Sequence, residues 1–370
     1  MKKYDVAAFI WPSYTGDELR TRIFWPRGFG EWETVMEAQP KFEGHLWPRK
    51  PLWGYCNEAD PAVMEMQIEQ ATRHGINVFI YDWYWYDGRP FLENCLNDGF
   101  LKAANNKKMK FFLMWANHNV NHLWDRRLAG TEEGKTIIWN GASDFEQFKI
   151  IVDRWLEKYF CLDNYYTIDS KPVLMIYDIE NLVVGFGGIE NTRKAMDYLR
   201  EKVKEAGFPD VHLQFCVRGD RDCKPERVGE ACTYAQLTEK LGADSATNYQ
   251  TGQLVSYNGD FLDQLENEKK AWKKIDEDYS IPYFPHVSCG WDTNPRYQML
   301  KPNIITNNTP ENLETAFRTA VEYVNTHNLP APLITVNSWN EWTEGSYLQP
   351  DDLYGYGYLE AAKRVFVDEE

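Results

Sequence analysis

The 370-residue sequence predicts an α/β protein, a closed (β/α)8 TIM barrel formed as a single domain by residues 1–370. Eight short apolar runs alternate with longer segments of helical spacing along one uninterrupted chain. Several of the runs are apolar on both faces, which is typical of strands that are covered on both sides. A doubly wound sheet is the alternative, but the first run continues into Trp11-Pro12-Ser13-Tyr14 rather than into a glycine-rich phosphate turn.

The eight expected strands are rich in Val, Ile, Phe and Tyr. The second follows Gly75, a residue that commonly ends helices, and Pro285 interrupts the seventh. The sixth has the weakest apolar pattern. In chain order they are residues 4–11, 76–83, 110–115, 172–177, 211–217, 243–249, 282–287 and 332–337.

Helix-start signals precede several of the segments between these runs. Asp60-Pro61 and Thr309-Pro310 each place a capping residue before a proline at the first helical position. The expected helices are residues 60–74, 143–159, 191–206, 260–275, 309–327 and 356–367. Residues 12–60, rich in Trp and Gly, are expected to form an extended loop over one face of the barrel.

Composition excludes several classes of partner. With 40 basic and 56 acidic residues the formal net charge is −16, which disfavours nucleic acid and anionic membranes. It also disfavours a strongly anionic polymer, unless Arg218 and its neighbours form a local basic pocket. No run of about 18 apolar residues predicts a transmembrane helix. The seven cysteines and the absence of a secretory pattern favour a cytoplasmic location, with a periplasmic or secreted one as the alternative if a leader was removed.

The chain contains 15 Trp, 22 Tyr and 19 Phe. Composition alone favours an aromatic core, but Trp, His, Asn and carboxylates follow nearly every expected strand, where barrel enzymes keep their sites. Aromatic faces that stack on sugar rings, with polar groups that bond the hydroxyls, form a carbohydrate cleft. The candidate binding residues are Trp11, Tyr14, His45, Tyr81, Trp83, Trp85, Trp115, Asn117, His118, Tyr177, Arg218, His286, Trp291, Trp339, Asn340 and Trp342.

The densest cluster follows the eighth strand and contains Glu341 and Glu344. Glycoside hydrolysis needs one protonated carboxylic acid for the leaving oxygen and a second, ionised carboxylate as base or nucleophile. Burial against Trp and a neighbouring negative charge would raise one pKa. The pair is therefore the catalytic candidate. The alternative is that one glutamate is structural and tied to a backbone amide or an arginine.

Other polar residues allow two interpretations each. His118 and His122 lack both the intervening glutamate of a zincin and an obvious third ligand, so we expect hydroxyl binding or structural bonds, and neither a metal nor a cofactor. His45 either closes over the cleft or braces its loop. Arg218 either binds substrate carboxylates or hydroxyls, or pairs with Asp220. Tyr81 and Trp115 fit rim packing equally well.

Motifs spread along most of the chain point to one protein family. The most specific is Trp339-Asn340-Glu341-Trp342-Thr343-Glu344-Gly345, together with Met114-Trp115-Ala116-Asn117. The others are Gly30-Glu31-Trp32, Phe42-Glu43-Gly44-His45, Gly54-Tyr55, Asp60-Pro61, Gln67-Ile68, Gly75-Ile76, Tyr81-Asp82-Trp83-Tyr84-Trp85, Lys171-Pro172-Val173 and Gly355-Tyr356. In these motifs the chain resembles the WbsX-like proteins, which are related to glycoside hydrolase family 99 and its retaining endo-α-mannosidases.

The resemblance implies a (β/α)8 barrel in which Glu341 deprotonates the sugar 2-hydroxyl and Glu344 is the general acid, then base. The chain departs from family 99 at Thr343, where those enzymes usually carry histidine. We therefore expect a retaining glycoside hydrolase acting on an oligo- or polysaccharide. The alternatives are a glycosyltransferase of surface polysaccharide biosynthesis, for which the sequence shows no nucleotide-sugar signature, and a non-catalytic glycan-binding barrel.

Overall fold

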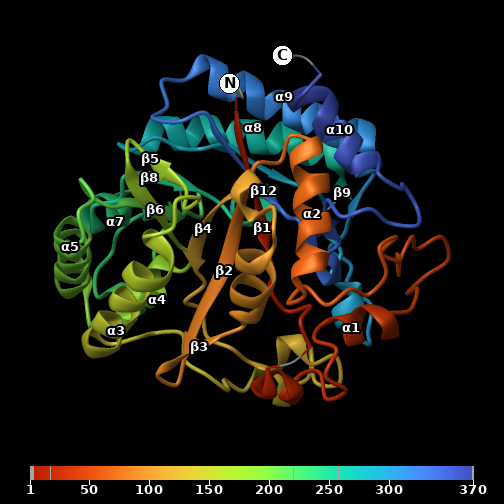
Figure 1. Ribbon diagram of the computed structural model, residues 1–370, viewed down its shortest axis with the longest axis horizontal. Helices are drawn as coiled ribbons and strands as arrows, with labels where there is room; N and C mark the ends of the chain where they lie inside the picture. The colour runs from red at the N-terminus through yellow and green to blue at the C-terminus, as the bar shows by residue number, and fades with distance from the viewer. Residues whose placement is uncertain (1–3, 17, 220, 257–258, 369–370) are drawn as a thin grey trace.

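The computed structural model describes residues 4–16, 18–219, 221–256 and 259–368. Within these residues, parallel strands form a barrel in the order β10-β12-β1-β2-β4-β6-β7-β8, which confirms the predicted fold class (Figure 1). Their bounds are β1 Asp5–Ile10, β2 Val78–Tyr86, β4 Lys110–Trp115, β6 Lys171–Ile176, β7 His212–Cys216, β8 Ser245–Thr247, β10 His286–Ser288 and β12 Leu333–Asn337.

The barrel closes between β8 and the residues just before β10. Ala246 forms a parallel bridge with Tyr283. Its N–H donates to the Pro282 carbonyl at 2.9 Å, and its carbonyl accepts from Phe284 N at 2.8 Å. Pro285 has no N–H and separates this bridge from β10, which pairs with β12 instead. The seventh strand is thus divided at Pro285, as the sequence predicts.

Helices surround the barrel (Figure 1). The two expected caps are present, because Asp60 accepts from Ala62 N at 2.9 Å and Thr309 from Asn312 N at 3.3 Å. Asp144, expected inside the first turn of its helix, is instead the cap of α3 and accepts from Gln147 N at 2.8 Å. The helices are α1 Trp32–Glu37, α2 Pro61–Arg73, α3 Phe145–Trp155, α4 Ile179–Phe186, α5 Ile189–Glu205, α6 Pro225–Val228, α7 Tyr234–Leu241, α8 Phe261–Asp278, α9 Pro310–Thr326 and α10 Gly357–Phe366.

Several elements differ from the prediction. The helices α4 and α7 are additional, and they begin at the caps Asp178 and Thr233. Strand β2 continues past Trp83 to Tyr86 and turns into β3, Arg89–Phe91. Between β3 and β4 the described chain forms short π and 3-10 turns in place of an α-helix: Cys95–Gly99, Phe100–Lys102 and Asn106–Lys108.

Residues 12–60 lie beside α2 toward the end of the barrel where β2 meets β3 (lower right of Figure 1). A bridge from Pro51 to Asp351 and a buried ion pair of Arg49 with Asp351 at 3.3 Å fix this segment to the C-terminal part of the chain. Gly30 has φ +60°, and a Cβ there would lie 1.9 Å from the Ser13 carbonyl oxygen. Only glycine permits this close turn, which places Glu31 at the carboxyl ends of the strands.

Shorter elements complete the chain. Within the described residues, no helix has the length and apolar character needed to span a membrane. The remaining strands are β5 Thr167–Ile168, β9 Gly259–Asp260, β11 Ile305–Thr306, β13 Asn340–Glu341 and β14 Ser346–Tyr347, and further 3-10 or π turns lie at Leu19–Ile23, His122–Trp124, Glu133–Lys135, Leu156–Phe160, Thr251–Gln253, Asn294–Arg296 and Trp342–Glu344.

Candidate active site

A cavity of about 300 Å³ opens at the carboxyl ends of the strands, where α/β barrels keep their active sites. Both glutamates of the predicted pair line it. The lining residues are Trp11, Asp82, Tyr84, Met114, Ala116, His118, Leu123, Trp124, Tyr177, Asp178, Arg218, Tyr249, Arg296, Glu341 and Glu344.

Strand alternation decides which side chains reach this cavity. On β2, Asp82 and Tyr84 line the cavity, whereas Trp83 and Trp85 lie on the opposite face of the strand. Trp83 Nε1 donates to Glu93 at 2.7 Å, and Trp85 Nε1 donates to Gln147 of α3 at 3.1 Å. The rings of these two tryptophans therefore pack between the barrel and its helices.

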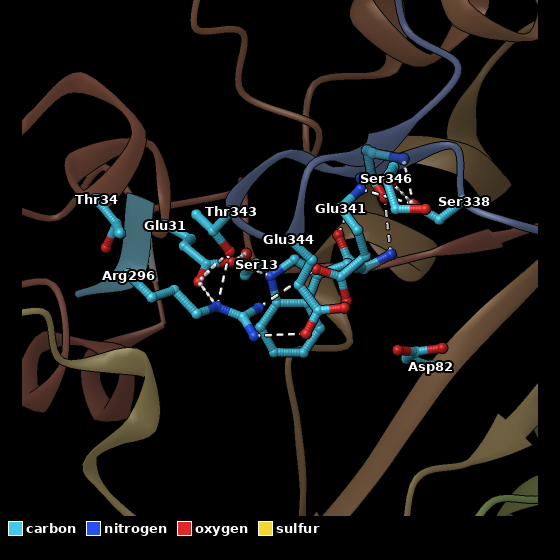
Figure 2. Close-up of polar contacts among 12 residues, drawn as sticks. Ser13, Glu31, Thr34, Asp82, Arg296, Ser338, Glu341, Thr343, Glu344 and Ser346 are labelled. Carbon is cyan, nitrogen blue, oxygen red and sulfur yellow. Dashed lines mark hydrogen bonds and ion pairs between the residues drawn. The ribbon is translucent and has the colours of Figure 1, made fainter. Parts of the chain in front are cut away.

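One guanidinium holds both candidate catalytic glutamates (Figure 2). Arg296 Nη1 donates to Glu344 Oε1 at 2.6 Å, and Nη2 lies 3.3 Å from Glu341 Oε2. Glu341 is 3 % exposed, and the Arg296 side chain is 4 % exposed. The two carboxyls are thus brought together at one buried cation.

Glu31, from the long first connection, contacts the same arginine. Arg296 Nε donates to Glu31 Oε1 at 3.2 Å and to Thr343 Oγ1 at 2.8 Å. The Thr343 hydroxyl in turn donates to Glu31 Oε1 at 2.9 Å, and Trp11 Nε1 donates to Glu31 Oε2. These bonds fix the orientation of the guanidinium, so Thr343, the point of departure from family 99, has a defined role in positioning Arg296.

Tyr249 links Glu341 to a second buried carboxyl. Its hydroxyl lies 2.8 Å from Glu341 Oε1 and 3.1 Å from Asp82 Oδ2. A hydroxyl carries one hydrogen, so Tyr249 can donate to only one of these oxygens, and the other contact requires a protonated carboxyl that donates to Tyr249. Burial raises the pKa of Asp82 well above its usual range, against the bond from Tyr249. Burial therefore favours the protonated form of Asp82.

Burial also sets the charge of the glutamate pair. It raises the pKa of Glu341 well above the ordinary value, and the charge of Glu344 raises it further while Arg296 opposes both. Burial raises the pKa of Glu344 as well, against the attraction of Arg296. Because Glu31, Glu341 and Glu344 all face one guanidinium within the described chain, their mutual repulsion favours the protonated form of one member of the pair.

The opposite wall of the cavity contains His118, Tyr177 and Arg218 from the predicted set. The His118 and Tyr177 rings meet edge to face with centroids 5.6 Å apart. Burial lowers the pKa of His118, which favours the neutral ring. The alternative pairing of Arg218 with Asp220 lies outside the described residues. The rings of Trp11 and Trp124, with centroids 4.9 Å apart, add aromatic surface to the cavity.

Several other predicted residues support the site without lining its cavity. Asn340 accepts from Trp11 N at 2.8 Å and donates to the Trp11 carbonyl at 2.9 Å, which ties the segment after β12 to the end of β1. Asn117 bonds the backbone of Asp178 in the same way, at 2.8 Å for both contacts. The buried His45 ring lies 2.7 Å from Asp292, so it braces the first connection. Tyr14 packs on Trp32, and Trp291 is half-buried beside the core.

The remaining predicted residues correct the expectation of a cleft lined by tryptophans. Trp339 donates to Gln67 at 2.7 Å, Trp342 donates to Gln349 at 2.7 Å, and neither ring is exposed. Tyr81 packs on Phe100, and Trp115 stacks on Phe148 of α3, so both face the helical layer. His286 lies in the barrel interior between Thr335 and Ser288, and burial lowers its pKa to about 3.

Sequence reasoning did not select Arg296, Asp82, Tyr84, Trp124 and Tyr249. For Asp82, Tyr84 and Tyr249 a usable signal existed, because alternation from an inward-facing neighbour marks them as inward-facing. Arg296 lies in a 3-10 turn, Asn294–Arg296, eight residues beyond β10, and no local pattern indicates that its side chain returns to the strand ends. Among the described residues, no group of three or more His, Cys, Asp or Glu is arranged to hold a metal ion.

Solved structures of other proteins share the barrel fold of this chain. The GH99 endo-alpha-mannosidase from Bacteroides thetaiotaomicron superimposes with a TM-score of 0.63 at 14% identity, over 100% of this chain and 98% of that one. A glycoside hydrolase-like protein gives 0.62 at 14% identity, over 99% and 94%. This likeness shows a shared fold.

The family model described as Glycosyltransferase WbsX matches residues 7–362, and the chain belongs to this family. The uncharacterized protein WxcX of Xanthomonas campestris pv. campestris is 26% identical to this chain over 345 residues, which are 92% of this chain and 47% of that one. The chain spans about half the length of the curated relatives that it matches.

Proposed function

We propose that the protein is a retaining glycoside hydrolase that cleaves an oligo- or polysaccharide with Glu341 and Glu344. The observation that carries this proposal is the attachment of both carboxyls to the Arg296 guanidinium in one cavity at the strand ends, at 2.6 and 3.3 Å. The family 99 fold of similar structures supports it. The cavity lies at the small end of the range for ligand sites, which suits a short stretch of glycan.

The proposed chemistry uses the sugar 2-hydroxyl. Glu341 takes the proton of this hydroxyl, whose oxygen attacks the anomeric carbon and forms an epoxide-like intermediate. In the same step Glu344 gives its proton to the leaving glycosidic oxygen. Glu344 then takes a proton from a water molecule that opens the intermediate, and Glu341 returns its proton to the 2-oxygen. Two displacements at one carbon retain its configuration.

The contacts of each glutamate fit these roles. Glu341 lies against the Tyr249 hydroxyl and Arg296, both of which stabilise an ionised carboxylate. The raised pKa of Glu341 makes it a stronger base when ionised. Burial raises the pKa of Glu344, as a general acid requires. Thr343 and Glu31 hold the guanidinium between them, so the two carboxyls keep their separation as protons move.

Aromatic and polar groups around the pair suit a sugar ring. Trp11, Tyr84, Trp124 and Tyr177 line the cavity beside His118. Flat apolar faces with a small number of polar groups are the usual composition of a carbohydrate site. These contacts support a glycan as the ligand of this cavity.

Sugar transfer is a second candidate, favoured by the name of the matching family, Glycosyltransferase WbsX. A retaining glutamate pair can pass the glycosyl group to a sugar hydroxyl instead of water, so transfer needs no different residues here. Transfer from a nucleotide sugar is a separate reaction. Product formation that requires a nucleotide sugar would favour it over hydrolysis.

The test is a glycan panel in which reducing ends are measured for the wild-type protein and Glu344→Gln. We expect the wild type to release reducing ends from at least one glycan and Glu344→Gln to lose about 10²–10⁴-fold in rate with an unchanged melting temperature. The exposed Glu190→Gln, 85 % exposed at its side chain, is the matched control. Cleavage by Glu344→Gln at the wild-type rate would overturn the assignment.

A further inference from the structure

Arg218 lies in the wall of the cavity and has no part in the proposed proton transfers. It follows β7 and lines the cavity together with Tyr177 and Asp178. The side chain is only partly exposed. Burial opposes its charge, but Tyr177, Tyr234 and Asp178 raise its pKa, so it is a permanent cation.

The nearby acidic groups are engaged by other partners. The Asp178 carboxylate caps α4 by accepting from Asn181 N at 2.8 Å, and it lies 3.4 Å from Arg227. Glu180 pairs with Arg227 at 2.8 Å. In the part of the chain that the structure describes, no carboxylate forms an ion pair with Arg218, in contrast to Arg296.

Arg218 and the glutamate pair share one cavity. Tyr177 lines it together with Arg218, Glu341 and Glu344. The Tyr177 and Tyr249 rings meet edge to face with centroids 5.4 Å apart, and Tyr249 bonds Glu341. A sugar whose anomeric carbon lies at the pair therefore has Arg218 facing it across the same cavity.

We propose that this site takes a glycan whose reacting or adjacent sugar carries an anionic substituent, a carboxylate or a phosphate, which binds the Arg218 guanidinium. This inference rests on the proposed function for the position of the sugar. A partly buried guanidinium that has no carboxylate partner among the described residues is costly without an anion, and its planar donors match carboxylate and phosphate oxygens in pairs. One local cation in a chain of net charge −16 suits a single acidic sugar unit rather than a polyanion.

The test compares binding of matched glycans by calorimetry. The probes are oligosaccharides that contain glucuronic or galacturonic acid, their carboxyl-reduced forms with identical linkages, and oligosaccharides with a sugar 6-phosphate. We expect wild-type protein to bind an acidic probe about 10- to 100-fold more tightly than its neutral form, and Arg218→Gln to lose this difference. Preference for the uronic acid or for the phosphate identifies the anion.

Control variants separate this effect from a loss of fold or of charge. Arg218→Lys keeps the charge but loses the planar donor pair, and we expect part of the preference to remain. Arg73→Gln removes a positive charge from a side chain that is 65 % exposed at the end of α2, and full preference should remain. Equal melting temperatures of Arg218→Gln and wild type show that the fold is kept.

The outcomes distinguish this inference from the hydrolase proposal. Tighter binding of neutral glycans, no binding of any acidic probe, or an acidic preference that survives in Arg218→Gln would overturn the inference. Cleavage of a neutral glycan as fast as its acidic counterpart would support the hydrolase proposal and contradict the inference of an acidic sugar. Acidic binding that depends on Arg218, with no release of reducing ends, would support the inference and contradict hydrolysis.

Discussion

Arg296 Nη1 lies 2.6 Å from Glu344 Oε1, and this contact joins the turn after β10 to the turn after β12. The same guanidinium reaches Glu341 and Glu31. Burial opposes the charge of Arg296, but these glutamates raise its pKa well above its ordinary range. A single cation therefore controls the charge of both proposed catalytic carboxyls.

Replacement of this cation should affect stability and activity together. In Arg296→Met we expect a loss of about 3–5 kcal/mol in the free energy of unfolding, because the glutamates are left buried without a counter-charge. Glycan cleavage should fall below detection. Urea unfolding measures the first effect, with Arg193→Met on exposed α5 as control. A variant with wild-type stability would show that the ion cluster is not needed to offset the burial of its carboxyls.

The pH profile should depend on Tyr249. Glu341 acts as base only when ionised, so activity should fall as the pH drops through its raised pKa, and the acidic limb of kcat/KM should lie well above pH 4.5. Tyr249→Phe removes a donor that favours the ionised form, so this limb should move to higher pH. Tyr84→Phe, whose hydroxyl lies 3.5 Å from Asp82, should move it less. An acidic limb of kcat/KM at the same pH in wild type, Tyr249→Phe and Tyr84→Phe would contradict the role of Tyr249.

Leaving-group chemistry can separate the roles of the two glutamates. An aryl glycoside with an acidic phenol departs without protonation, so it does not need a general acid. We expect Glu344→Gln to regain most of the lost rate of the first step on such a substrate, while Glu341→Gln stays inactive. Stopped-flow release of the phenol measures this step. Recovery by Glu341→Gln instead would exchange the two assignments.

A buried carboxyl outside the site should make stability depend on pH. Burial raises the pKa of Glu268 to about 8, although a hydrogen bond from Thr251 acts to lower it. In the unfolded chain this group ionises near pH 4.5, so its stabilising contribution is full below that value and is lost as pH rises toward 8. Glu268→Gln should remove this dependence, a difference of roughly 3–4 kcal/mol between pH 5 and 8. Urea unfolding at both pH values measures this difference, with the exposed Glu266→Gln as control. The same change in the free energy of unfolding between pH 5 and 8 in Glu268→Gln and in wild type would refute the prediction.

The barrel could be predicted because its strands and helix starts have local signals. Apolar runs located the strands, and capping residues such as Asp60 and Thr309 located helix starts to within one residue. The short helix α4 was missed because its 8 residues are too few for a helical period to be recognised. The continuation of β2 to Tyr86 depends on pairing with β3, which a strand pattern alone does not reveal.

The site was predicted less completely, for two physical reasons. Proximity to a strand end does not tell which face a side chain occupies, so Trp83 and Trp115 were grouped with Trp11 although they pack against helices. Alternation along β2 resolves this ambiguity. Arg296 could not be found in this way, because the long-range contacts with Glu31 and Glu341 that place it are absent from any local stretch of sequence.

The contact between Glu31 and Arg296 joins residues separated by 265 positions. During synthesis the ribosome therefore releases Glu31 long before its counter-ion, and Glu341 and Glu344 follow later still. The pocket gains its working charge only after the last strand has joined the ring. Partly made chains consequently lack the proposed catalytic pair, and contacts of such long sequence separation slow the final stage of folding.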